Sequence, residues 1–337
     1  MLLAEELRRK SFAEGTQGNL RSQYKSWDLF CFIYEKNMPA SPGDLLQYAS
    51  WLVLTGRAKC QGTVKNHLSA VRTFHKLLGL QCSVPSEYGP LQLAVRGLSR
   101  HFNRLIHQAP PITWRVLLQM TQILDSMSPY RFNIWHIHRI ISRVISTCLK
   151  VAFFSMLRCD NLVPSSTGKF EPRRQLVWGR VGLLPGCGAV LKVVLAKNLQ
   201  DGSREVELPI PEMEGVGICP VTALKDLLTI PGYPCSPLSP VFSMPATDGS
   251  WLPVSRYQLD KVFQALVHKL GLVGEQDIHG IRRGGLQLAL VTTGSLDLVR
   301  TQSFHKSEAV QTYLHLPPQY RQVVSGSMIN AVVQNIW

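Results

Sequence analysis

The hydrophobic pattern of this 337-residue chain changes its period twice, and this change restricts the possible folds more than any other feature. Apolar residues recur at helical spacing through most of the first 162 residues, alternate as in strands, and then return to helical spacing from residue 220 to the end, interrupted by a Pro/Gly/Ser loop at 231–253. The alternating segments, bounded by Gly and Pro turns, are 175–181, 189–196 and 203–208. The pattern predicts a mainly α fold with a small antiparallel sheet of three strands.

A proline-rich segment separates two helical regions of the chain. Residues 107–113 contain Pro110 and Pro111, which favour a stiff, extended backbone, and Thr113 is a suitable N-cap for a helix that follows. The length of the chain suits two domains of ordinary size. We therefore expect an all-helical domain over 1–107, a linker over 108–113 and a mainly helical α+β domain over 114–337.

The positive charge of the chain is concentrated in one block. The formal net charge is +14, and residues 51–150 hold thirteen Lys and Arg but only two acids, Glu87 and Asp125. A block with so much charge of one sign repels itself unless a polyanion lies against it, and nucleic acid is the usual polyanion. The alternative is a generally basic, solvated surface.

One segment of this block, 63–80, predicts an amphipathic helix with Thr63 as N-cap and Gly79 as its stop. Its apolar stripe consists of Val64, Leu68, Val71, Phe74 and Leu78. Lys65, Arg72 and Lys76 fall on another face, which is how a helix packs on its own domain while facing a phosphate backbone. An ordinary solvated face has the same pattern, so these three residues are candidates for DNA binding.

Several classes of site are excluded by the sequence. It contains no phosphate loop, no complete dinucleotide fingerprint, no GxSxG and no HExxH. His136 and His138 have no nearby Cys, Asp or Glu to complete a metal site, so we expect no metal. The eight cysteines are scattered, which is typical of reduced thiols and not of a disulfide scaffold. No apolar run is long enough to span a membrane. Acidic residues near the start of the chain interrupt what would be the apolar stretch of a signal peptide. We therefore expect a soluble intracellular protein that has no membrane contact.

The residues that could carry phosphate chemistry are spread over the second half of the chain. His279 and Arg282 are three positions apart, on neighbouring positions of one helical face. Arg158 follows a buried apolar run and is expected to project from the end of that helix. Three further residues could take part in phosphate chemistry: Lys197, expected at the end of a strand, His305 and Tyr313. Each of these residues alone has an ordinary structural explanation.

Taken together and in this order, the six residues resemble the tyrosine recombinase family of phage-integrase type. The matching elements are Leu157–Leu162 around Arg158, Lys197, the His279-x-x-Arg282 motif, His305 and Tyr313. The segments 109–113, 282–285 and 305–314 are most similar to eukaryotic mobile-element recombinases of the DIRS and Crypton types. The resemblance covers most of the chain and implies a helical, SAM-like core-binding domain followed by the recombinase catalytic domain.

The resemblance also implies a role for each residue. Arg158, Arg282 and His305 would stabilise charge on the non-bridging phosphate oxygens, where Arg is suited because its planar fork binds phosphate bidentately. Tyr313 would be the nucleophile that forms a 3′-phosphotyrosyl intermediate, Lys197 the general acid, and His279 an assistant in proton transfer. Tyr320 is a rival nucleophile, but its spacing from His305 does not fit. Such a reaction needs no metal, ATP or small-molecule cofactor.

The partners implied by the resemblance are double-stranded DNA and three further copies of the chain, forming a homotetramer during strand exchange. The apolar stretch Met328–Trp337 would pack on a neighbouring copy or on its own domain. A eukaryotic recombinase would act in the nucleus. Two alternatives stay open: a DNA-binding protein derived from a mobile-element recombinase that has lost the reaction, and a type IB topoisomerase.

Overall fold

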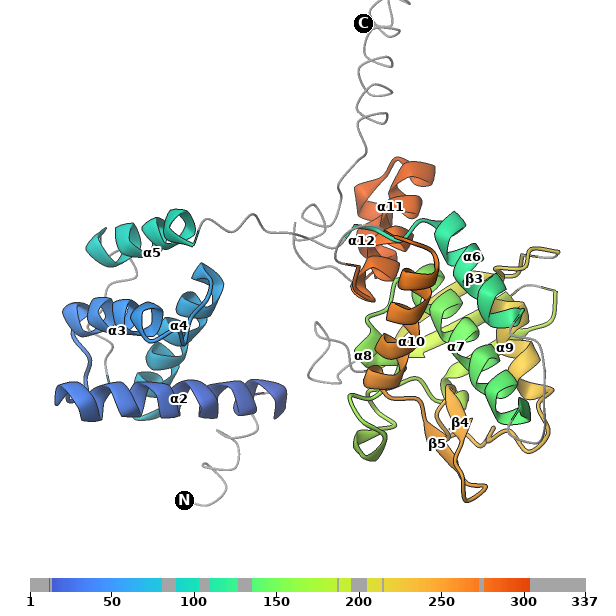
Figure 1. The fold of residues 1–337 in the computed structure, drawn as a ribbon, viewed down its shortest axis with the longest axis horizontal. Helices are drawn as coiled ribbons and strands as arrows, with labels where there is room; N and C mark the ends of the chain where they lie inside the picture. Colours follow the sequence, from blue (N-terminus) through green and yellow to red (C-terminus); the bar gives the residue numbers. More distant parts are fainter. Residues whose placement is uncertain are drawn as a thin grey trace, which may run out of the picture. The chain divides into compact units, whose positions relative to one another are not determined.

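The computed structural model describes residues 12, 14–80, 89–102, 110–126, 135–186, 188–194, 205–213, 215–272 and 276–303. The chain divides into two compact units, Met1–His107 and Gln108–Trp337 (Figure 1). None of the helices in the described ranges combines the length and the apolar character that crossing a membrane requires.

The N-terminal unit is helical wherever it forms regular structure in the described residues. Its helices are α2 (Glu14–Tyr34), α3 (Pro42–Leu54), α4 (Gln61–Leu77) and α5 (Gly89–His101). Aromatic side chains form the centre of its core: the rings of Trp27 and Tyr48 meet edge to face at 4.9 Å, and Phe30 packs against both. These rings are on α2 and α3, so the helical spacing of apolar residues predicted for this part of the chain includes the residues of this core.

Helix α4 begins earlier than predicted, whereas its stop is the predicted one. It begins at Gln61 with Cys60 as N-cap, and not at Thr63, because the amide of Thr63 already donates to the carbonyl of Cys60 (3.2 Å). Gly79, in the left-handed region at φ +71°, follows the helix end as predicted. The predicted apolar stripe is buried except for Leu78, which is 61% exposed because it lies beyond the last helical turn.

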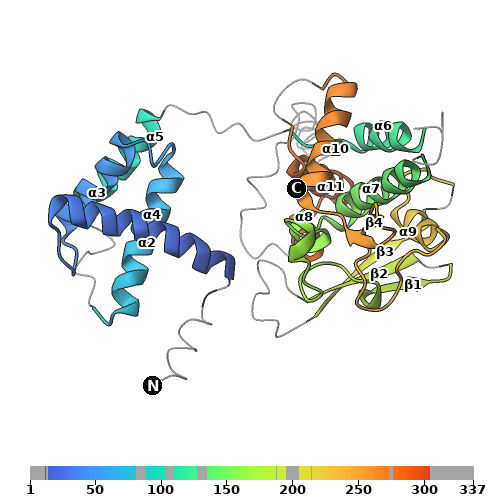
Figure 2. The ribbon, with the colours of Figure 1, turned by 60° about the horizontal axis from the view of Figure 1, so that its bottom comes forward.

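The C-terminal unit is built around the long helix α7, whose buried residues are in contact with α6, α9 and α11. Figure 2 shows β1, β2 and β3 side by side at one edge of the unit, with α9 next to them. The helices are α6 (Trp114–Asp125), α7 (Trp135–Ser155), α8 (Cys159–Leu162), α9 (Pro220–Leu228), α10 (Arg256–Lys269), α11 (His279–Thr293) and α12 (Leu296–Ser303). Two 3-10 turns, η1 (Thr167–Lys169) and η2 (Trp178–Arg180), precede the sheet.

The three-stranded antiparallel sheet is present, but its strands are displaced from the predicted segments. They are β1 (Val181–Leu184), β2 (Gly188–Val193) and β3 (Val206–Pro211), in the order β1-β2-β3, with Leu191 of β2 opposite Val181 and Leu208. The predicted first strand, 175–181, is wrong because Trp178 and Gly179 donate hydrogen bonds to Ser239 and Pro237, which hold this segment in a 3-10 turn.

A second small sheet lies inside the segment 231–253, which was predicted to be a loop. It pairs β4 (Ser243–Pro245) with β5 (Trp251–Pro253). Each strand has only three residues and ends in proline, so neither shows a period that a sequence reading can detect.

The residues that follow Pro110 lie in contact with α11. The amide of Ile112 donates to the carbonyl of Gly280 (2.8 Å), and the Ile112 side chain is 2% exposed. Thr113 caps α6 by accepting a hydrogen bond from the amide of Val116 (3.3 Å), as predicted. The last residues of the predicted linker are therefore part of the packed C-terminal unit.

Candidate active site

Arg158 lies in a sharp turn between α7 and the single-turn helix α8. Helix α7 ends at Ser155, whose hydroxyl donates to the carbonyl of Val151 (2.6 Å) and accepts from the amide of Leu157 (3.3 Å). Met156 has φ +52°, in the left-handed region that residues other than glycine rarely adopt. The expected position of Arg158 at the end of the buried helix is therefore wrong: it is the N-cap of α8, two residues beyond this reversal.

Three glycines allow α11 to approach its neighbours closely. A Cβ on Gly284 would lie 1.7 Å from the carbonyl oxygen of Ile112, and one on Gly280 would lie 2.8 Å from that of Pro110. On Gly285, a Cβ would lie 2.1 Å from the carbonyl oxygen of Phe153, near the end of α7. Only hydrogen in place of Cβ leaves room for this packing. The helix is therefore seated between the segment before α6 and the end of α7.

This seating brings α11 against the turn that carries Arg158. Met156 of the turn packs with Leu286 of α11 and Val299 of α12. Arg282, one turn before Leu286, is 8% exposed, and its charge acts on Cys159, the residue after Arg158. The structure thus brings Arg158, His279 and Arg282 into one region of the C-terminal unit.

The guanidinium of Arg158 has no hydrogen-bond or ion-pair partner within the part of the chain that the structure describes. Its side chain is partly buried, and the charge of a second cation, Arg282, acts on the next residue, Cys159. A partly buried arginine whose only role is to stabilise the fold is usually paired with a carboxylate. The arrangement suits an anion from outside the protein, such as a phosphate group.

His279 is the first residue of α11, and its ring is partly buried. Burial lowers the pKa of His279 below its usual value of 6.5, Asp277 raises it, and the cations Arg256, Arg282 and Arg283 lower it further. The net effect favours the neutral imidazole, which can both donate and accept a proton. Its Nδ1 atom is buried and has no hydrogen-bond partner among the described residues.

The lowered pKa of His279 predicts a pH dependence of stability. The unfolded chain binds a proton on this ring near pH 6.5, whereas the folded chain binds it only at lower pH, so the contribution is present above about pH 6.5 and lost below it. We expect the free energy of unfolding, measured with urea, to fall less between pH 7.5 and 5.5 in His279→Gln than in the unmodified chain. His268→Gln, which changes an exposed histidine on α10, should leave the difference unchanged. An unchanged difference in His279→Gln would contradict the prediction.

Cys159, next to Arg158, is not a competing nucleophile. Burial raises the pKa of its thiol to about 12, and the nearby cation Arg256 offsets only part of this effect. A thiol with this pKa is protonated at neutral pH and therefore unreactive.

The remaining predicted site residues lie outside the described ones. These are Lys197, which falls between β2 and β3 in the sequence, and His305 and Tyr313, which follow α12. The rival nucleophile Tyr320, the apolar stretch Met328–Trp337 and the side chains of His136 and His138 are outside as well. Among the residues that are described, no group of three or more His, Cys, Asp or Glu is arranged to hold a metal ion.

The predicted DNA-binding residues of α4 do not have equal exposure. Lys65 and Lys76 are exposed, whereas Arg72 is partly buried and its Nε has no hydrogen-bond partner among the described residues. Helix α5, which sequence reasoning did not identify, adds the exposed Arg96 and Arg100, and Gln61 of α4 is tied to it through the carbonyl of Val95 (2.7 Å). Both arginines are among the thirteen basic residues counted in the block 51–150, and the structure places them on one helix.

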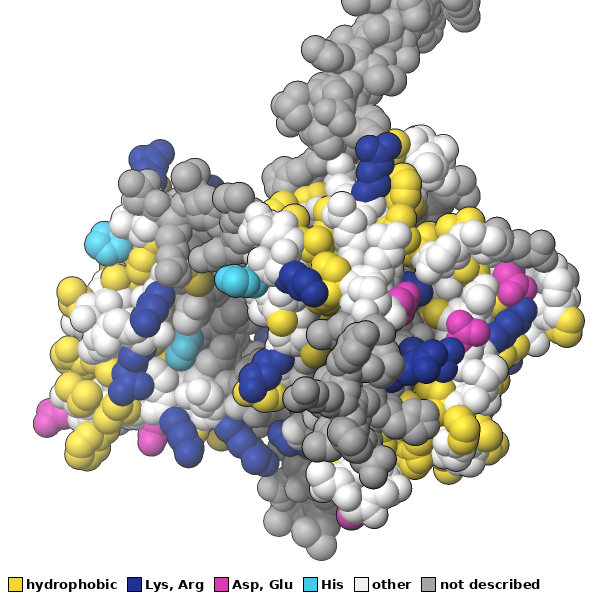
Figure 3. All heavy atoms as spheres, turned by 45° about the vertical axis from the view of Figure 1, so that its right-hand side comes forward, with side chains coloured by type: hydrophobic (Ala, Val, Ile, Leu, Met, Phe, Trp, Pro, Cys, Tyr) yellow, Lys and Arg dark blue, Asp and Glu magenta, His cyan; other side chains and the backbone are white. Residues whose placement is uncertain are grey.

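Figure 3 shows Lys and Arg side chains, in dark blue, on the visible surface of both units.

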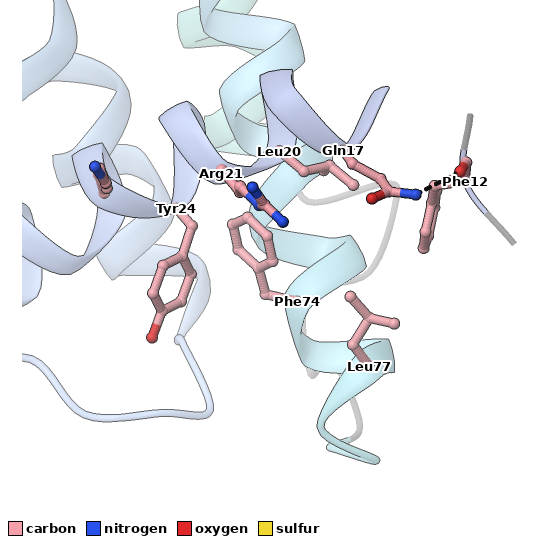
Figure 4. Close-up of a pocket in the computed structure, with 8 residues that line it drawn as sticks. Phe12, Gln17, Leu20, Arg21, Tyr24, Phe74 and Leu77 are labelled. Carbon is pink, nitrogen blue, oxygen red and sulfur yellow. Dashed lines mark hydrogen bonds between the residues drawn. The ribbon is translucent and has the colours of Figure 1, made fainter. Parts of the chain in front are cut away.

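The N-terminal unit also has an apolar groove between α2 and α4, with a volume of about 400 Å³. In Figure 4 the ring of Tyr24 stands edge to face against Phe74, at 5.0 Å, and Leu20 and Leu77 extend the apolar lining. Its lining contains no residue of the candidate active site. All the residues that line the groove belong to the N-terminal unit.

No protein-family profile and no curated protein matches the sequence. Solved structures do match. A lambda integrase dimer bound to a COC′ core site has a TM-score of 0.53 at 14% identity, over 92% of this chain and 74% of that one. XerH site-specific recombinase bound to palindromic difH substrate, in a post-cleavage complex, gives 0.55 at 15% identity, over 88% and 75%.

The Tn1549 transposon integrase (residues 82–397), in complex with circular intermediate DNA, has a TM-score of 0.51 at 12% identity, over 96% of this chain and 97% of that chain. At identities this low, the three similarities concern the fold. The predicted fold class is confirmed: this chain has the mainly helical fold, with small antiparallel sheets, of the tyrosine recombinases.

Proposed function

We propose that this protein cuts and rejoins DNA strands at specific sites, as a tyrosine recombinase or integrase. The observation that carries the proposal is the seating of α11 on its glycines, which brings Arg282 and His279 to the turn of Arg158. The recombinase fold and the DNA in the complexes of lambda integrase, XerH and the Tn1549 integrase support it.

In the proposed reaction the phenolic oxygen of Tyr313 attacks the phosphorus atom, and the bond from phosphorus to the 5′ oxygen breaks. Lys197 gives a proton to the leaving 5′ oxygen, while Arg158, Arg282 and His305 donate hydrogen bonds to the non-bridging oxygens. A neutral His279 accepts and returns the phenolic proton. The 5′-OH of another strand then attacks the 3′-phosphotyrosyl bond, so the bond energy is kept and no ATP, metal or other cofactor takes part.

The proposed partner is double-stranded DNA, held in part by Lys65, Arg72 and Lys76 and by the other cations of residues 51–150. Strand exchange joins two duplexes, and we propose that four copies of the chain assemble on them. A lambda integrase tetramer bound to a Holliday junction, with a TM-score of 0.54 and 14% identity, supports this number. An origin in a eukaryotic mobile element, and the nuclear location that goes with it, rest on the motif resemblance.

The test is to trap the covalent intermediate. The full chain is mixed in EDTA with labelled, nicked duplexes of random sequence, then denatured, and the label on the protein is measured beside native gel shifts. We expect an adduct that survives denaturation and is absent from Tyr313→Phe.

Other results would contradict particular parts of the proposal. An adduct that persists in Tyr313→Phe but not in Tyr320→Phe would move the nucleophile to Tyr320. Gel shifts without an adduct would favour a DNA-binding protein that has lost the reaction. Relaxation of any supercoiled plasmid, without a specific site, would indicate a type IB topoisomerase.

A further inference from the structure

The turn that carries Arg158 depends on contacts from other parts of the chain. Helix α8 has only four residues, and a single helical turn is not stable by itself. On one side it is held by the segment before β1: the amide of Leu176 donates to the carbonyl of Asn161 (2.8 Å), and the Gln175 side chain donates to the carbonyl of Asp160 (3.0 Å).

On another side α8 is held by Arg256, the first residue of α10. Its amide donates to the carbonyl of Pro164 (2.7 Å), just beyond α8. Its guanidinium lies between two carboxylates, with Nη1 3.6 Å from Oδ1 of Asp160 and Nε 3.0 Å from Oδ2 of Asp260. Asp260 is one turn along α10, so this second contact fixes the guanidinium in the orientation that reaches Asp160.

The start of α10, where Arg256 lies, is held in place by its own contacts. Ser255 and Gln258 form a capping box at the start of α10, in which the Ser255 hydroxyl accepts from the amide of Gln258 (3.3 Å) and the Gln258 side chain accepts from the amide of Ser255 (2.8 Å). Val254 and Leu259 on either side are fully buried. A side chain held in this way can transmit the position of α10 to α8.

Arg256 also lies close to the rest of the candidate site. Its charge acts on Cys159, next to Arg158, and on His279 at the start of α11. Asp160 is two residues after Arg158, in the first turn of α8, so the ion pair acts on the same turn that carries the Arg158 guanidinium.

We propose that Arg256 is a positioning residue, which fixes the turn of Arg158 by its ion pair with Asp160 and so places the Arg158 guanidinium for the reacting phosphate. This inference rests on the proposed function. Because a group displaced by about 1 Å can slow a reaction by up to about 100-fold, a loose α8 would slow strand cleavage without weakening DNA binding.

The first test is a set of variants in the covalent-adduct assay. We expect Arg256→Gln and Asp160→Asn each to lower the single-turnover rate about tenfold, and the double variant to be no slower than either one, since both remove the same contact. The affinity for DNA should stay within about twofold. In an Arg158→Ala background, Arg256→Gln should have no further effect. Additive losses, or a loss that persists without Arg158, would overturn the proposal.

The second test does not depend on activity. Hydrogen exchange of peptide 157–164, which contains the amides of Asn161 and Val163 bonded within α8, should become about tenfold faster in Arg256→Gln. Lys225→Gln is the matched control, because it breaks another ion pair of this unit, with Glu212 at 2.7 Å, and should leave this peptide unchanged. If the unmodified chain forms no adduct, the proposed function fails. If hydrogen exchange of peptide 157–164 is unchanged in Arg256→Gln, the positioning role of Arg256 is wrong, whatever the result of the adduct assay.

Discussion

Arg282→Lys is expected to lower the single-turnover rate of covalent adduct formation by about 100-fold or more. Removing one preorganised donor to the charge of a transition state costs a factor of this order. Lysine keeps the positive charge but loses the planar fork that binds two phosphate oxygens at once. Because the charge is kept, the affinity for DNA in gel shifts should change by less than about threefold.

The chain provides a matched control at the next position. Arg283 is as deeply buried as Arg282, 9% against 8% exposed, and lies on the same turn of α11, but it is outside the His-x-x-Arg spacing. Arg283→Lys should retain the rate within about threefold. Equal losses in the two variants would show that burial of an arginine on this turn, and not contact with phosphate, sets the rate.

The sequence was sufficient for the fold class because helices and strands differ in their hydrophobic period. The buried residues Val64, Leu68, Val71 and Phe74 followed the predicted stripe of α4. The boundaries failed where long-range hydrogen bonds determine them. The bond from Gly179 to Pro237, for example, replaces the start of a strand by a 3-10 turn, and no local pattern signals a contact across 58 positions.

For the candidate site, the sequence predicted the relative placement of two residues on one helix. The spacing of His279 and Arg282 placed them on one face of a helix, and α11 begins at His279. The sequence did not indicate that Arg158 caps a separate short helix, because the reversal at Met156 uses a residue with no preference for the left-handed region. Nor did it indicate the ion pair between Arg256 and Asp160, residues that are brought together only by the fold.

The glycines of the motif, which contribute to the family resemblance, also have a physical role that can be tested. Gly284→Ala is expected to destabilise the C-terminal unit by about 3 kcal/mol or more, since the new Cβ would lie 1.7 Å from a backbone oxygen, that of Ile112. Backbone cannot move aside as a flexible side chain can. With stabilities of about 5–15 kcal/mol typical of whole proteins, such a loss leaves the unit near its unfolding threshold.

Calorimetry of the full chain can measure this effect, because each unit has its own core and should give its own unfolding transition. Gly97→Ala is the control. Gly97 lies in α5, and among the described residues no atom apart from its chain neighbours and its own helix backbone lies within 4 Å of the Cβ it would gain. Helix propensity should therefore make the change neutral or stabilising by about 0.5–1 kcal/mol. A Gly284→Ala chain that keeps the stability of its C-terminal unit would show that α11 can move away from Ile112. Arg282 and His279 would then be free to shift with it, and the seating of α11 would not be what holds them beside Arg158.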